Sequence, residues 1–117
     1  MPLLKLQTSL PAVPDGESLL RELSRILAAG LGKSESYVMT LLLTGLPMTF
    51  AGEAGPTCYL EIKSIGAMTP QQTHALSQAL CTHLHDALGV PAGRIYIEFG
   101  DVRASHWGWN GQTFASR

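Results

Sequence analysis

The sequence has little of what several classes of protein need. Only 15% of its 117 residues are charged, against about 25% in an average domain, and the net charge of −1 comes with no basic run to neutralise phosphates. No apolar run approaches the ~20 residues that span a bilayer, and the N-terminus lacks the regions of a signal peptide. We therefore expect no nucleic-acid partner, no membrane partner and a cytoplasmic location, with export without a signal peptide as the alternative.

Cysteine and histidine are too few and too scattered to build a metal or redox site. Cys58 and Cys81 do not form a Cys-x-x-Cys pair, and we expect both to be buried free thiols. The four histidines lack the spacing of a ligand set, since His83 and His85 lie two residues apart on a predicted helix and face different ways. Glycine-rich phosphate loops and nucleophile elbows are missing as well. The sequence thus predicts no metal and no cofactor motif.

What is present is a pattern of strand, helix and strand that occurs twice. The first half predicts a strand over 2–8, a helix that starts after an N-cap at Asp15 and ends at Gly32, and a strand over 37–43 that is apolar on both faces. The second half predicts a strand over 58–62, a helix that starts after Thr69 and ends at Gly89, and a strand over 94–99. Each half therefore has the pattern of a βαβ unit.

The two halves are related by a constant offset. The distance between the two helix-ending glycines is 89 − 32 = 57 residues, and the same offset relates Leu19 to Leu76 and Val38 to Ile95. We interpret this as one domain over 1–117, with pseudo-repeats over about 2–45 and 58–101 and a C-terminal tail over 102–117. Right-handed crossovers then predict an α+β fold, in which a four-stranded sheet carries both helices on one face.

The other face of that sheet is left uncovered in this arrangement. It would carry apolar side chains, such as those of the 41–43 run, and a large exposed apolar face indicates an interface. The low charge content points the same way. We expect a closed ring of subunits with the uncovered faces turned inward.

The N-terminus offers a candidate catalytic group. Initiator methionine is usually removed before a small residue, which would leave Pro2 as a free secondary amine at the head of an apolar strand. Desolvation or a nearby cation would lower the pKa of such an amine below its ordinary value of about 8, into the range where it acts as a general base. With Met1 attached, the Pro2 nitrogen is an amide and has no such role. The simpler alternative is an idle proline.

Several motifs in fixed order resemble one known family. They are Met1-Pro2, Val13-Pro14-Asp15-Gly16, Gly32-Lys33 followed by Tyr37, Ser64-Ile65-Gly66, Arg94-Ile95-Tyr96-Ile97, Asp101 and the tail 108–115. Together they resemble macrophage migration inhibitory factor and its tautomerase relatives, over nearly the whole chain. The resemblance implies a homotrimer of duplicated βαβ subunits, with an active site at each subunit interface. It also implies cofactor-free interconversion of the keto and enol forms of phenylpyruvate-like or dopachrome-like substrates.

The resemblance also implies roles for individual residues. Pro2 would be the catalytic base, Lys33 would hold the substrate carboxylate, and the backbone N–H of Ile65 would contact the substrate. Tyr37 and Tyr96 would be pocket aromatics, with Tyr96 reaching in from the neighbouring subunit. A cation suits an anionic substrate, and donors at the site would stabilise the charge that builds on an enolate oxygen.

Two positions of the implied pocket depart from the family pattern. Glu98 stands in place of an asparagine and adds negative charge near an anionic substrate, unless it points away or pairs with Arg94 or Arg103. Trp107 replaces a smaller aliphatic residue on the pocket rim and leaves the substrate size preference open. These departures favour an alternative function, a cytokine-like trimer that binds a protein receptor and has a vestigial pocket.

Simpler interpretations of the same residues remain open at this point. Lys33 follows a helix, where a cation suits the helix dipole anyway, and the tyrosines and tryptophans could be packing residues. The two βαβ units alone would also fit a small-ligand sensor domain with a ferredoxin-like topology.

Overall fold

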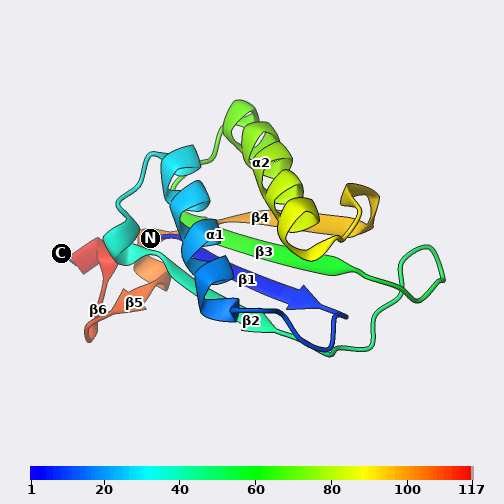
Figure 1. Cartoon of the computed structure of the whole chain (residues 1–117). Coiled ribbons are helices and arrows are strands. Elements are labelled where there is room, and N and C mark those ends of the chain that lie inside the picture. The colour runs from blue at the N-terminus through cyan, green and yellow to red at the C-terminus, as the bar shows by residue number, and fades with distance from the viewer. Residues whose placement is uncertain (117) are drawn as a thin grey trace.

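The computed structural model describes residues 1–116 and contains two α-helices and a four-stranded mixed sheet (Figure 1). The strands of this sheet are β1 (Leu3–Thr8), β2 (Met39–Leu43), β3 (Cys58–Ile65) and β4 (Ile95–Val102), in the order β2-β1-β3-β4. β1 pairs with β2 in parallel and with β3 antiparallel, and β3 pairs with β4 in parallel. The helices are α1 (Gly16–Leu31) and α2 (Pro70–Leu88).

Both helices begin and end where local chemistry predicts. The Asp15 carboxylate accepts a hydrogen bond from the Ser18 N–H at 3.1 Å and caps α1. Thr69 and Gln72 form the expected capping box at the start of α2, with Pro70 in the first turn. Gly32 and Gly89 end the helices in the left-handed conformation that glycine adopts readily. The predicted helices are therefore confirmed with their caps.

The core lies between the helices and one face of the sheet. Figure 1 shows α1 and α2 on the same side of the sheet, as the right-handed crossovers predict. The inward side chains of the two central strands are fully buried against both helices; they and their helical partners are Leu4, Leu6, Leu60, Ile62, Leu23, Leu27, Leu80 and Leu84. The two halves keep their spacing of 57 residues here, since Leu23 corresponds to Leu80 and Leu27 to Leu84.

Two short 3-10 turns correct the predicted strand boundaries. The strand predicted over 37–43 starts only at Met39, because Tyr37 belongs to the turn η1 (Glu35–Tyr37). The side chain of Ser34 accepts a hydrogen bond from the Ser36 N–H and caps this turn. Likewise Arg94 lies in η2 (Ala92–Arg94), not in β4. β3 and β4 run further than predicted, to Ile65 and Val102, while β1 starts one residue later than predicted, at Leu3.

The helix-free face of the sheet is less apolar than expected. Apolar side chains gather on the edge strand β2, where Met39 is 64% exposed, so this face is left uncovered in the single chain, as expected. The central strands instead present charge, because alternation along them turns Lys5 and Glu61 outward, with their charged atoms 3.8 Å apart. Lys63 adds a second cation 3.4 Å from the same carboxylate.

Two extensions project from opposite ends of the sheet (Figure 1). The 46–56 loop, which connects β2 to β3, extends beyond the ends of β1 and β2. The tail forms η3 (Ala104–His106), the hairpin of β5 (Gly108–Trp109) and β6 (Gln112–Thr113), and η4 (Phe114–Ser116), and it lies near the N-terminus. No helix in the described part of the chain is both long and apolar enough to cross a bilayer.

Candidate active site

A cavity of about 390 Å³ lies at the head of β1, between η1 and the C-terminal tail. Its walls come from three segments that are far apart in the sequence, and its lining residues include Met1, Pro2, Ser36, Tyr37, Met39, Trp107, Trp109 and Phe114. Three of the residues that the sequence singles out, Pro2, Tyr37 and Trp107, therefore meet here. The tail lines one side of the cavity, and within it the Phe114 N–H donates to the Trp107 carbonyl at 3.1 Å.

Pro2 is the buried group of this cavity. Its ring is almost completely inaccessible, although it precedes the first residue of β1 by one position. The Pro2 carbonyl accepts a hydrogen bond from the Met39 N–H at 3.1 Å, which extends the β1–β2 ladder by one step. Residue 2 is thus held by the edge of the sheet and lines the cavity.

The environment of the N-terminus disfavours a positive charge. Burial lowers the pKa of the Met1 α-ammonium below its ordinary value of 8.0, and the nearby Lys33 ammonium lowers it further. Lys33 is exposed just beyond α1, and its Nζ donates to the Ile65 carbonyl at 3.0 Å. That bond ties two of the predicted site residues together at the end of β3.

An aromatic cluster forms one wall of the cavity. The rings of Tyr37 and Trp109 meet edge to face at 5.4 Å between centroids, and Trp109 stacks on Phe114 at 6.0 Å. Trp109 stays 47% exposed, as a ring does that lines an open cavity. The sequence did not identify Trp109 and Phe114 as site residues, because the tail has no periodicity that reveals its contacts. Two signals point to this segment: the family resemblance of the tail 108–115, and the Trp-Asn-Gly turn, which brings the two rings back together.

Tyr96 and Glu98 lie away from this cavity in the same chain. In the sheet, Tyr96 lies opposite Tyr59 of β3, which in turn lies opposite Gln7 of β1. Gln7 is four residues, or about 13 Å, along β1 from Leu3, the residue that follows Pro2. Glu98 pairs with neither of the two arginines that the sequence offered: its carboxylate accepts a hydrogen bond from the Tyr59 hydroxyl at 2.5 Å. That bond is the main reason why the pKa of Tyr59 is raised.

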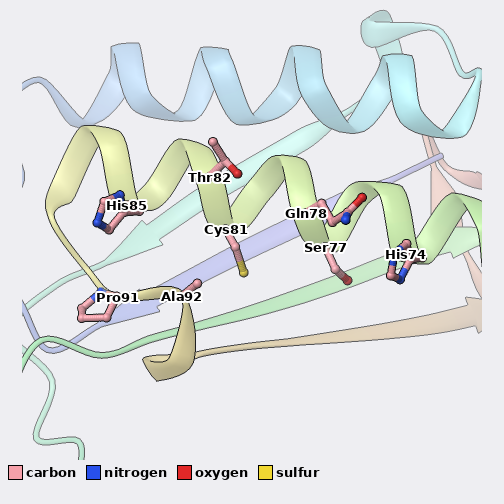
Figure 2. Close-up of a pocket in the computed structure, with 8 residues that line it drawn as sticks. All are labelled: His74, Ser77, Gln78, Cys81, Thr82, His85, Pro91 and Ala92. Carbon is pink, nitrogen blue, oxygen red and sulfur yellow. The ribbon is translucent and has the colours of Figure 1, made fainter.

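A larger groove of about 740 Å³ runs along the outer side of α2. Figure 2 shows Ser77 and Cys81 on the side of α2 that faces η2, with His74 and His85 towards the two ends of the groove. Its lining contains no amine and no carboxylate, and burial raises the pKa of the Cys81 thiol, which keeps it protonated. Among residues 1–116, no three His, Cys, Asp or Glu side chains are placed to hold a metal ion. The smaller cavity is therefore the better candidate for chemistry.

Comparison with known proteins places this fold in a family. Residues 1–115 match the family model of macrophage migration inhibitory factor (MIF). The chain is 36% identical to a MIF homologue of Trichuris trichiura, over 97% of this chain and 100% of that protein, and 35% identical to MIF of Rattus norvegicus, over 98% and 100%.

Solved structures agree with this assignment. The crystal structure of a MIF homologue from Prochlorococcus marinus is 56% identical and superposes with a TM-score of 0.92, over 96% of this chain and 98% of that chain. MIF from Trichinella spiralis is 32% identical with a TM-score of 0.88, over 96% and 99%. The family match runs from residue 1 into the tail that lines the cavity, and the chain belongs to the macrophage migration inhibitory factor family.

Proposed function

We propose that this protein is a cofactor-independent keto–enol tautomerase for phenylpyruvate-like or dopachrome-like substrates, with the Pro2 amine as general base after removal of Met1. The observation that carries the proposal is the position of Pro2, buried in a cavity with an aromatic wall and close to a lysine that disfavours protonation of the N-terminus. Family membership supports the same activity.

The proposed reaction moves one proton within the substrate. The neutral Pro2 nitrogen takes a proton from the carbon next to the carbonyl, while the C–H electron pair forms the C=C bond and the carbonyl oxygen becomes an enolate. The resulting ammonium then gives the proton to that oxygen, and the enol leaves. Lys33 and the Ile65 N–H would hold the substrate carboxylate, while the aromatic wall holds its ring. Trp107 would limit the size of that ring.

The proposal includes a homotrimer whose active sites lie between subunits. The strand register places Tyr96 far from Pro2 within one chain, and neither Tyr96 nor Glu98 lines the cavity. Tyr96 is also 66% exposed. A neighbouring copy could bring both residues to the cavity, and the exposed apolar edge at β2 offers a surface for that contact. Glu98 is then held by Tyr59 and would face the substrate as an oriented carboxylate.

Two measurements test this function. Intact mass shows whether Met1 is absent from the purified protein. Phenylpyruvate ketonisation is then followed with the processed wild type, Pro2→Gly and a form with Met1 retained. We expect a loss of at least about 100-fold in kcat for both altered proteins, since a positioned base contributes that much or more. Wild-type rates in Pro2→Gly would remove the Pro2 ring amine from the mechanism, and wild-type rates in the form with Met1 retained would remove any amine at residue 2.

Family membership also supports a second candidate, a cytokine-like trimer that acts by binding a receptor. The specific observation in its favour is the Glu98 carboxylate, which would place negative charge beside an anionic substrate. A processed protein with negligible turnover that still stimulates receptor-bearing cells would favour this candidate. Robust turnover without a cellular response would count against it.

A further inference from the structure

The 46–56 loop, called here the arm, is an ordered projection at the end of the sheet opposite the cavity (Figure 1). Phe50 and Glu53 pair with each other through two backbone hydrogen bonds of 2.9 and 3.0 Å and close its tip. Ala51 and Gly52 lie between them at positive φ, as a tight hairpin turn requires. The arm is therefore a miniature hairpin, yet a two-stranded hairpin alone is only marginally stable in water.

Arg94 supplies the support that the arm lacks. Its guanidinium donates to the Glu53 carbonyl at 3.1 Å, to the Pro56 carbonyl at 2.8 Å and to the Thr57 hydroxyl at 2.8 Å. The first of these bonds reaches the tip of the arm and the other two reach its base. At Gly55, between them, a Cβ would come within 3.4 Å of the guanidinium, and the φ of 140° also favours glycine.

The same guanidinium organises two aromatic rings. It lies 5.8 Å from the centroid of the Phe50 ring, which in turn meets the Tyr96 ring edge to face at 5.1 Å. Tyr96 nevertheless remains 66% exposed. A large ring that is held on one side and open on the other is arranged for contact with another molecule, because its side-chain freedom has already been lost.

We propose that Arg94 is a positioning residue that holds the arm and Tyr96 in the conformation that docks onto a second copy of this chain. The proposal rests on the proposed function, in which Tyr96 completes the active site of a neighbouring subunit. It goes further by assigning the orientation of Tyr96 to a residue that touches neither substrate nor the reacting atoms. A second copy is the expected partner because Tyr96 does not line the cavity of its own chain and lies towards the opposite end of the sheet, where it is open to another molecule.

Arginine is required here for its geometry as well as its charge. Three acceptors in different directions can be satisfied only by the fixed fork of a guanidinium, and lysine offers a single nitrogen in its place. Arg94→Lys would keep the positive charge and lose most of the clamp. The two substitutions Arg94→Ala and Arg94→Lys therefore separate a clamp from a simple cation.

The first experiment measures kinetics and assembly of Arg94→Ala and Arg94→Lys, with Arg21→Ala as the control. Arg21 is an exposed α1 residue that forms an exposed ion pair with Glu17. We expect both Arg94 variants to keep the circular dichroism spectrum of the wild type. They should raise KM for phenylpyruvate about tenfold or weaken assembly in sedimentation velocity. Their kcat should stay within about twofold of wild type at saturating substrate and high protein concentration. Phe50→Ala should reproduce this effect. Wild-type KM and assembly in Arg94→Ala, or full rescue by lysine, would overturn the proposal.

The second experiment asks whether the arm acts on another copy. Pro2→Gly and Arg94→Ala chains are unfolded, mixed in equal amounts and refolded together, then assayed at substrate concentrations below KM. In a closed ring, about one site in four combines a Pro2 from the Arg94→Ala chain with an intact arm from the other, so activity should reach about a quarter of wild type. If the arm acted within its own chain, every intact Pro2 would belong to a chain with the Arg94→Ala change. Half of the sites would then work at about a tenth of the wild-type rate, and the mixture would show about a twentieth of wild-type activity. That result would overturn the proposal.

The two proposals fail in different ways. If Pro2→Gly alone is as active as wild type, the proposed function fails, whatever the mixture does. If Pro2→Gly is inactive and the mixture shows no recovery above the average of its parents, the function stands and the role of Arg94 is wrong. An Arg94→Ala protein that assembles and binds substrate like wild type would equally rule out that role.

Discussion

Replacement of Lys33 by methionine tests the electrostatics of the cavity most directly. The ammonium is fixed by its 3.0 Å hydrogen bond to the Ile65 carbonyl, and it lies close enough to the N-terminus to lower the pKa of the amine there. Methionine keeps most of the length of the side chain and removes only the charge. A hydrogen bond to a charged group contributes about 1.5–3 kcal/mol, and the exposure of Lys33 favours the lower end because water screens the charge.

We therefore expect Lys33→Met to raise KM for an anionic keto acid about tenfold, which corresponds to about 1.4 kcal/mol. KM of the wild type should rise with added salt, since a Debye length of about 8 Å at physiological ionic strength screens such a contact. KM of the variant should depend on salt much less. Stopped-flow or steady-state ketonisation assays at three salt concentrations give both quantities.

The pH profile provides the second readout. The base acts only when neutral, so kcat/KM falls as the pH drops below the pKa of the N-terminal amine. Burial and Lys33 lower the pKa of the Met1 amine. We expect Lys33 to act in the same way on the Pro2 amine of the processed chain, so its loss should move the acid limb of the profile to higher pH. Lys63→Met is the matched control, because Lys63 pairs with Glu61 on the helix-free face. An unchanged acid limb and an unchanged KM in Lys33→Met would refute this electrostatic reasoning.

Three further predictions concern stability and thiol chemistry. Ser64→Ala should stabilise the protein by about 1 kcal/mol, because the buried Ser64 hydroxyl has no hydrogen-bond partner among residues 1–116. Thr8→Val should destabilise the protein by about 1–3 kcal/mol, because the Thr8 hydroxyl donates to the Thr57 carbonyl. Urea unfolding at one protein concentration compares the two variants, and equal shifts in the free energy of unfolding would contradict this distinction. Gly30→Ala places a Cβ 2.4 Å from a Leu76 methyl. The free energy of unfolding should therefore fall by about 1 kcal/mol, although alanine favours a helix more than glycine does. A higher free energy of unfolding in the same assay would argue against tight packing between α1 and α2. Burial raises the pKa of the Cys58 thiol, which should react with a disulfide reagent at pH 8 only after unfolding; rapid labelling of the folded protein would refute its burial.

Much of the fold could be predicted because it depends on local signals. Asp15, Thr69 and the two helix-ending glycines act within one or two helical turns, so their residue types are enough to place the helix ends. The spacing of leucines within each half likewise predicts which helix faces are buried. A repeat of the same pattern then predicts one sheet with both helices on one face.

The site was less predictable, because its walls depend on contacts between distant segments. The sequence predicts a strand at Tyr37, yet the turn capped by Ser34 includes this residue, and its ring packs against Trp109 and Phe114. Nothing near residue 37 in the sequence identifies those partners. The role expected for Tyr96 stays a prediction, since it depends on a second chain, and the same holds for the roles assigned to Pro2 and the other candidate residues.

The turns η1 and η2 begin 92 − 35 = 57 residues apart, so Tyr37 and Arg94 occupy equivalent positions in the duplicated units. An ancestral half would have carried one such turn. After duplication the two turns have diverged: Tyr37 of η1 lines the cavity, and Arg94 of η2 supports the arm. The two turns now lie at opposite ends of the molecule (Figure 1). The proposed contact between copies would therefore join unlike surfaces of identical chains, which is the geometry of a head-to-tail ring. Duplication has thereby given one polypeptide two different ends, which the proposal pairs between copies.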